Sequence, residues 1–148
     1  MSFISTKTYN HSIGLSCAFR QWRAKHSHCK YIHGYALSVR LNFKGMLNDR
    51  NWVYDFGDLK FVKEFLEETF DHKTVIAEDD PELETFKELE EKGLIQLRII
   101  PHVGCEKFAE YICKQIATTI EVNSNERVKL MSVEVREHSG NSAIYIND

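Results

Sequence analysis

The sequence predicts an α+β fold in which helices pack on one face of an antiparallel sheet. Strand-like segments lie near both ends of the chain, and amphipathic helix-like segments lie between them. The first two strand-like segments, 15–28 and 35–43, are joined by only a few residues, which suits a hairpin better than a parallel crossover. We therefore expect an antiparallel sheet rather than a doubly wound parallel one, in a single domain spanning residues 1–148.

Alternation of apolar and polar residues predicts the strands. It is clearest over 35–43, where every second residue from Tyr35 to Phe43 is apolar, the pattern of a strand with one buried face. The alternation over 15–28 is good enough for a strand that would carry polar residues to its end. Further strands are expected at 94–100, closed by Pro101, at 128–136, and at the edge segment 143–146.

Apolar residues at helical spacing predict three helices. The first covers 58–70, with Asp55 or Asp58 as its N-cap. The second, 82–92, is highly charged and ends at Gly93, a residue that often ends helices. The third covers 104–120, where apolar residues recur every four positions from Phe108.

The composition excludes several classes of protein. The chain is 43% hydrophobic and 28% charged, as in ordinary globular proteins, and its net charge of −3 without a basic stretch argues against binding duplex nucleic acid. No apolar run approaches the roughly 20 residues of a membrane span, and the first ten residues do not resemble a secretory signal. The four cysteines form no Cys-x-x-Cys pair, so we expect reduced thiols in a cytoplasmic protein.

The densest chemical segment is 22–35, which holds His26, His28, Cys29 and His33. On a strand His26 and His28 would share a face, with His33 just across a turn, so three imidazoles could hold a catalytic zinc with one open position. The alternative is a polar hairpin tip with exposed histidines. Cys29 beside these groups is a candidate reactive thiolate, the alternative being a buried, inert thiol.

Two further groups could take part in chemistry. Asp71 and His72 follow the first predicted helix, where an aspartate can orient an imidazole for acid/base work, although such dipeptides are also common by chance. Glu137 falls on the apolar face of the last long strand, with Val133 and Val135. A carboxylate there needs a partner, either a ligand with adjacent N–H donors or a nearby Arg or Lys.

Five motifs, in order, resemble those of the 6-pyruvoyl/6-carboxy-tetrahydropterin synthase family. They are Cys29 with His33-Gly34, Tyr54-Asp55-Phe56 before a helix, Phe70-Asp71-His72, Pro101 followed by Cys105-Glu106, and Val135 to Glu137 with Ala143 and Tyr145. The matches span residues 22–145. Where the family carries a third metal histidine, this chain has Tyr35, and His28 could replace the lost ligand because it would share a face with His26.

The resemblance implies a tunnelling fold, with a four-stranded antiparallel sheet and two helices per subunit, assembled around a barrel. It implies a homo-oligomer, a hexamer or trimer, with sites at subunit interfaces. Cys29 would abstract protons, and Asp71 with His72 would form a second acid/base unit from a neighbouring subunit. Glu137 would anchor the pterin, Glu106 would assist at its helix start, and His26, His28 and His33 would bind zinc.

The implied activity is that of a lyase acting on 7,8-dihydroneopterin triphosphate. The spacing from Cys29 to His33 favours the 6-carboxy-tetrahydropterin reaction, on the path to queuosine-type 7-deazaguanines. The alternatives are a 6-pyruvoyl-tetrahydropterin synthase, or a metal-free pterin-binding protein or aldolase of the same fold. A purely structural oligomer would bind no pterin.

Overall fold

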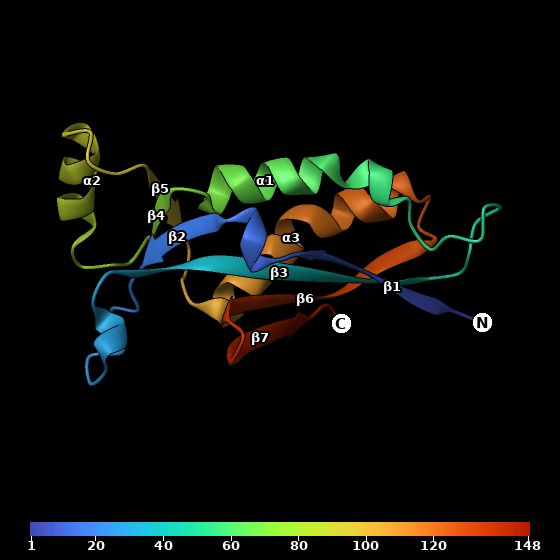
Figure 1. Ribbon diagram of the computed structural model, residues 1–148, viewed down its shortest axis with the longest axis horizontal. Helices are drawn as coiled ribbons and strands as arrows, with labels where there is room; N and C mark the ends of the chain where they lie inside the picture. Colours follow the sequence, from blue (N-terminus) through green and yellow to red (C-terminus); the bar gives the residue numbers. More distant parts are fainter.

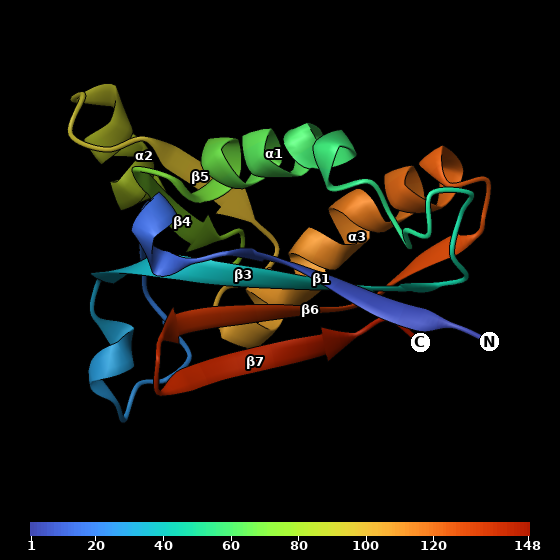
Figure 2. The same cartoon turned by 45° about the vertical axis from the view of Figure 1, so that its right-hand side comes forward.

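The computed structural model describes all 148 residues. The strands are β1 (Phe3–Tyr9), β2 (Leu15–Phe19), β3 (His33–Gly45), β4 (Lys73–Ala77), β5 (Leu97–Ile100), β6 (Val128–His138) and β7 (Asn141–Ile146). The α-helices are α1 (Lys60–Phe70), α2 (Leu83–Glu91) and α3 (Cys105–Asn123), and the short 3-10 helices are η1 (His11–Ile13), η2 (His28–Lys30) and η3 (Phe56–Leu59). The helices α1 and α3 lie on the same side of the long strand β3 (Figures 1 and 2).

The sheet has seven strands and is mixed, which corrects the prediction of four antiparallel strands. Its order is β5-β4-β2-β3-β6-β7, and β1 also pairs with β3. The strands β1, β3, β6 and β7 are antiparallel, whereas β4 runs parallel to both β2 and β5. The sequence did not reveal β4 because its five residues are all buried, so they lack the alternation that marks a strand with one exposed face.

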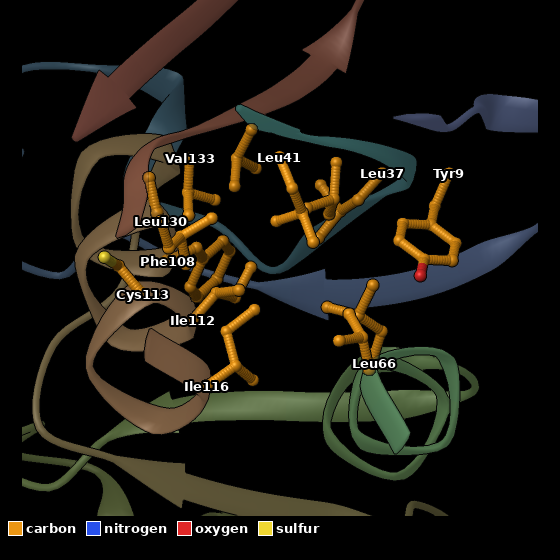
Figure 3. Close-up of a cluster of buried hydrophobic side chains, with 14 of the residues drawn as sticks. Tyr9, Leu37, Leu41, Leu66, Phe108, Ile112, Cys113, Ile116, Leu130 and Val133 are labelled. Carbon is orange, nitrogen blue, oxygen red and sulfur yellow. The ribbon is translucent and has the colours of Figure 1, made fainter. Parts of the chain in front are cut away.

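Apolar side chains of α1, α3 and the sheet form one main core of 27 buried residues. Phe108, Ile112 and Ile116 of α3 point toward the side chains of β3 and β6 (Figure 3). A second, separate cluster of three buried residues, Ile76, Phe86 and Leu97, holds α2 against β4 and β5. The predicted helical stripe at Phe108 and its successors therefore faces the sheet, as amphipathic helices generally do.

All three predicted helices are confirmed, and Asp55 acts as a cap. Its Oδ1 accepts a hydrogen bond of 2.8 Å from the Gly57 N–H at the start of η3. Gly93 follows α2 with a φ of 76°, in the left-handed region that glycine tolerates. No helix is long and apolar enough to cross a membrane.

The predicted strand over 15–28 is wrong beyond Phe19. From Arg20 the chain leaves the sheet, and local turn bonds replace ladder pairing: Ala24 N–H donates to the Gln21 carbonyl and Ser27 N–H to that of Ala24, both at 3.0 Å. Residues 20–32 therefore form a loop between β2 and β3, not a short hairpin turn. Figure 1 shows this loop extending beyond the end of the sheet.

Candidate functional site

Cys29 lies on η2, near the end of the loop of residues 20–32. Its N–H donates to the Ser27 hydroxyl at 3.1 Å, and its carbonyl accepts from the Gln21 N–H at 2.8 Å. Its thiol is partly exposed, whereas the three other cysteines, Cys17, Cys105 and Cys113, are buried. The loop therefore presents one accessible thiol beside the start of β3.

Glu137 lies near the end of β6, where the register with β7 is irregular. Its Oε1 accepts a weak hydrogen bond from the Cys105 Sγ at 3.7 Å, and the Tyr35 side chain lies near its carboxylate. The groups beside it are thus a thiol and a phenol rather than an arginine or lysine. A neutral setting of this kind leaves the carboxylate able to accept further hydrogen bonds from a ligand.

Glu137 faces an open, polar pocket of about 480 Å³. The start of α3 contributes Cys105 and Glu106, and Glu106 is exposed in the first turn of that helix. The pocket is also lined by Gly140, Asn141 and Ser142, at the turn from β6 into β7, and by Gln21 of the loop. Gln21 is therefore the residue through which the loop borders this pocket, and its N–H is bonded to the Cys29 carbonyl.

Cys105, the second thiol at the site, is held in its neutral form. Burial, followed by the negative charge of Glu137, raises the pKa of Cys105 to about 12, so Cys105 is a neutral thiol that donates to the carboxylate. The neighbouring Glu137 carboxylate is the main cause that raises the pKa of Tyr35, and burial acts in the same direction. Tyr35 is therefore a neutral phenol that can donate a hydrogen bond, and it lies near both Cys29 and Cys105.

The three predicted metal histidines do not converge, which corrects the proposed ligand set. His26 and His28 are exposed on the loop, because two residues separated by one share a face only on a strand, and β2 has already ended. His33 is the first residue of β3, with its Nδ1 2.7 Å from the Tyr31 carbonyl oxygen. No group of three or more His, Cys, Asp or Glu side chains is placed to hold a metal ion.

Aromatic rings surround His33 instead of further ligands. The ring centroid of Phe19, its direct partner on β2, is 5.5 Å away, and that of Tyr35 is 5.3 Å away. A phenylalanine offers no ligand atom, and tyrosine is not among the usual zinc donors. The residues present therefore do not fit a zinc centre with three protein ligands.

We expect elemental analysis of the purified protein to find far less than one zinc per subunit, with no tight uptake on titration. The informative comparison is the Phe19→His/Tyr35→His variant, because the rings that it replaces lie 5.5 and 5.3 Å from that of His33 and 6.2 Å from each other. This variant should take up zinc that the unmodified protein does not. Close to one tightly held zinc per unmodified subunit would contradict the expectation.

Asp71 and His72 form the expected pair but lie outside this pocket. The His72 Nδ1 is 2.7 Å from the Asp71 Oδ1, and the imidazole is exposed. The Ser16 N–H also donates to Asp71 at 3.4 Å, and the His72 N–H donates to the Ser16 carbonyl at 2.7 Å. These bonds fix the pair beside β2, with its imidazole exposed to solvent and not among the residues that line the Glu137 pocket.

Sequence reasoning missed the contacts of Tyr35 and Cys105 with Glu137. A usable signal existed for Tyr35, because it lies on the same face of β3 as the apolar residues from Leu37 onward, as Glu137 does with Val133 and Val135 on β6. The antiparallel pairing of Ser38 with Arg136 then places Tyr35 and Glu137 diagonally across neighbouring strands. Cys105 had no signal of its own beyond its place at a helix start.

The sequence of this chain matches a family model and the sequences of known proteins. A family model described as 6-pyruvoyl tetrahydropterin synthase matches residues 9–148. The chain belongs to the 6-pyruvoyl tetrahydropterin synthase family. A family member from Pyrococcus abyssi, provisionally named 6-carboxy-5,6,7,8-tetrahydropterin synthase, is 31% identical over 117 residues, covering 75% of this chain and 71% of its own. A protein of Archaeoglobus fulgidus with the same provisional name is 31% identical over 107 residues, covering 66% of this chain and 92% of its own.

Solved structures agree on the fold. An uncharacterised protein of Wolinella succinogenes superposes with a TM-score of 0.85 at 19% identity, covering 100% of this chain and 99% of its own. The 6-pyruvoyl tetrahydropterin synthase of Plasmodium falciparum superposes with a TM-score of 0.69 at 21% identity, covering 97% and 96%. The family is enzymatic and acts on pterins.

Proposed function

We propose that this family member is a lyase of the 6-carboxy-5,6,7,8-tetrahydropterin synthase type, acting on 7,8-dihydroneopterin triphosphate. The observation that carries the proposal is Glu137, an acceptor with no cationic partner, in a polar pocket bordered by the Cys29 loop. The provisional names of the two archaeal relatives support the choice of reaction. The product would serve the synthesis of queuosine-type 7-deazaguanines.

In this proposal Glu137 holds the pterin, because a carboxylate can accept two parallel hydrogen bonds from the amino group and ring N–H of an aminopyrimidine. Glu106, in the first turn of α3, assists at the edge of the pocket. The Cys29 thiolate removes a proton from the substrate side chain, and Asp71 with His72 returns or removes a proton on the opposite side. No step is assigned to a metal, since the donor set does not fit one.

Two alternative functions can be distinguished from this one by experiment. A 6-pyruvoyl-tetrahydropterin synthase would eliminate triphosphate without cleaving the side chain. A metal-free pterin-binding protein or aldolase of the same fold is favoured by one observation, the aromatic surroundings of His33. Such a protein would bind pterins without forming either product.

The experiment is incubation of the purified protein with 7,8-dihydroneopterin triphosphate, followed by mass spectrometry of the pterin products. A 6-carboxy product with loss of the side-chain carbons supports the proposal. A 6-pyruvoyl product supports the first alternative. Neopterin binding without either product assigns the chain to the metal-free alternative.

We also propose that the enzyme is a cytoplasmic homo-oligomer, a hexamer or trimer, in which Asp71 and His72 of one subunit serve the pocket of another. Neither residue lines the Glu137 pocket, the His72 imidazole is exposed, and an apolar pocket of about 490 Å³ lies beside β1, where Phe3, Trp52 and Phe56 are exposed. The four free cysteines suit a reducing compartment.

Subunit mixing tests the shared site. Cys29→Ala and His72→Ala proteins should each be inactive alone, because each lacks one proton-transfer group. When the two are unfolded, mixed and refolded together, some sites combine an intact Cys29 with an intact His72, so activity should return to about a quarter of the unmodified level for random pairing. Mixtures that stay as inactive as the separate proteins would contradict the shared site.

A further inference from the structure

The loop that carries Cys29 is tied to the β4–α2 connection by two arginine–aspartate pairs. The inner pair joins Arg20 to Asp80 through two hydrogen bonds, Nε to Oδ2 at 2.9 Å and NH2 to Oδ1 at 2.5 Å. The Asp80 side chain is 1% exposed and that of Arg20 is 20% exposed. A bidentate, largely buried pair of this kind fixes both position and orientation.

Asp80 is itself held firmly. Its Oδ1 also accepts from the Glu82 N–H at 2.9 Å, and its carbonyl accepts from the Leu83 N–H at 3.1 Å, at the start of α2. The Arg20 guanidinium lies 5.9 Å from the ring centroid of Phe86. Since Phe86 belongs to the small apolar cluster under α2, the arginine is anchored on that part of the protein.

The outer pair is more exposed. Arg23 NH2 lies 2.5 Å from the Asp79 Oδ2, and the Trp22 Nε1 donates to the Asp79 Oδ1 at 3.3 Å. The hydrogen bond from Arg23 is the main cause that lowers the pKa of Asp79. The Arg23 guanidinium also lies over the Trp22 ring, 4.4 Å from its centroid. Two consecutive aspartates thus receive three side chains from the first four residues of the loop.

A short chain of bonds leads from this anchor to Cys29. Arg20 directly precedes Gln21, whose N–H holds the Cys29 carbonyl at 2.8 Å. The other backbone bonds of residues 21–31 join residues within the loop itself, such as Ser27 to Ala24 and Tyr31 to His28. The loop is therefore a small folded unit whose placement against the protein depends on Arg20, Trp22 and Arg23.

We propose that Asp79 and Asp80 are positioning residues for Cys29, and that the segment from β4 to α2 serves as a clamp on the loop of residues 20–32. The effect on turnover rests on the proposed function of Cys29, but the placement of the thiol does not. The clamp acts on Cys29 and leaves Glu137, which lies on β6, in place. Loss of the clamp should therefore lower kcat more than it raises KM, because misplacement of a reacting group by about 1 Å can cost up to about a hundredfold in rate.

The test compares Asp80→Asn and Asp79→Asn with the matched control Glu68→Gln, which removes an arginine–carboxylate pair to Arg98 that does not touch the loop. We expect kcat to fall about tenfold or more in Asp80→Asn and a few-fold in Asp79→Asn, with KM within about twofold, and no change in Glu68→Gln. The rate and pH profile of Cys29 alkylation by iodoacetamide are followed by peptide mass spectrometry. They should change most in Asp80→Asn, less in Asp79→Asn and not at all in Glu68→Gln. The reversed pair Arg23→Asp/Asp79→Arg should recover most of the loss seen in Asp79→Asn.

Three results overturn the clamp. They are an alkylation profile that is the same in all variants, a rise in KM with unchanged kcat, or failure of the reversed pair to improve on Asp79→Asn. If Asp80→Asn does not fold, as judged by circular dichroism, Asp79→Asn and its reversed pair still decide, because that pair is exposed. Absence of turnover in the unmodified protein would refute the proposed function, while the alkylation profiles would still test the clamp.

Discussion

Replacement of Cys29 by alanine is expected to lower turnover of 7,8-dihydroneopterin triphosphate by about two to four powers of ten, the usual loss when a positioned proton-transfer group is removed. The reason is that no other thiol can take its place. Cys105 is close to the pocket, but burial and the charge of Glu137 raise its pKa to about 12, so it stays protonated. Steady-state kinetics of product formation provide the measurement.

The matched control is Cys113→Ala on α3, which removes a fully buried thiol far from the pocket lining. This variant should be less stable than the unmodified protein, but its kcat, measured on folded protein, should be unchanged. Neopterin affinity should be similar in the Cys29→Ala and unmodified proteins, because the thiol is not the pterin anchor. Turnover in Cys29→Ala close to that of the unmodified protein would remove the thiolate from the proposed reaction.

Replacement of Glu137 by glutamine is expected to weaken pterin binding about a hundredfold or more. A hydrogen bond to a charged group contributes about 1.5–3 kcal/mol, and the carboxylate is proposed to accept two from the aminopyrimidine edge. The amide places an NH2 group where the pterin also presents donors, so one bond is lost and a donor–donor contact replaces it. Isothermal titration with neopterin measures the change in Kd.

Glu134→Gln is the control on the same strand. Glu134 is bonded to Arg136 and to the pocket residue Ser142, but by strand alternation it lies on the opposite face of β6 from Val133 and Val135, and it does not itself line the pocket. Its replacement should leave the neopterin Kd unchanged. Equal affinity in Glu137→Gln and the unmodified protein would place the pterin elsewhere.

Much of the fold follows from patterns in the sequence, and the exceptions have physical causes. The strand β3 and the helices α1 and α3 were predictable because each buries one side and exposes the other. The strand β4 was not, because burial on both faces removes that contrast. The strand β1 was missed because Ser, Thr and Lys side chains occupy much of it and most of it is not buried.

The candidate site likewise combines residues whose placement could be predicted from the sequence with residues whose placement could not. Strand alternation correctly grouped Glu137 with Val133 and Val135, because that pattern is local to one element. The grouping of His26 with His28 failed because it required β2 to continue, and ladder pairing with β3 ends at the Phe19–His33 pair. The pairing of Arg20 with Asp80 could not be predicted, since it joins residues 60 positions apart across a parallel strand pair that the sequence did not reveal.

The small apolar cluster of Ile76, Phe86 and Leu97 is separate from the main core. Segments with few buried apolar contacts open locally at a lower free energy than the whole domain. On warming, α2 should therefore detach while the main sheet and α3 stay intact, and Asp80 would move with it. The proposed activity would then be lost below the melting temperature and regained on cooling, so its working range would be set by a small apolar cluster outside the main core.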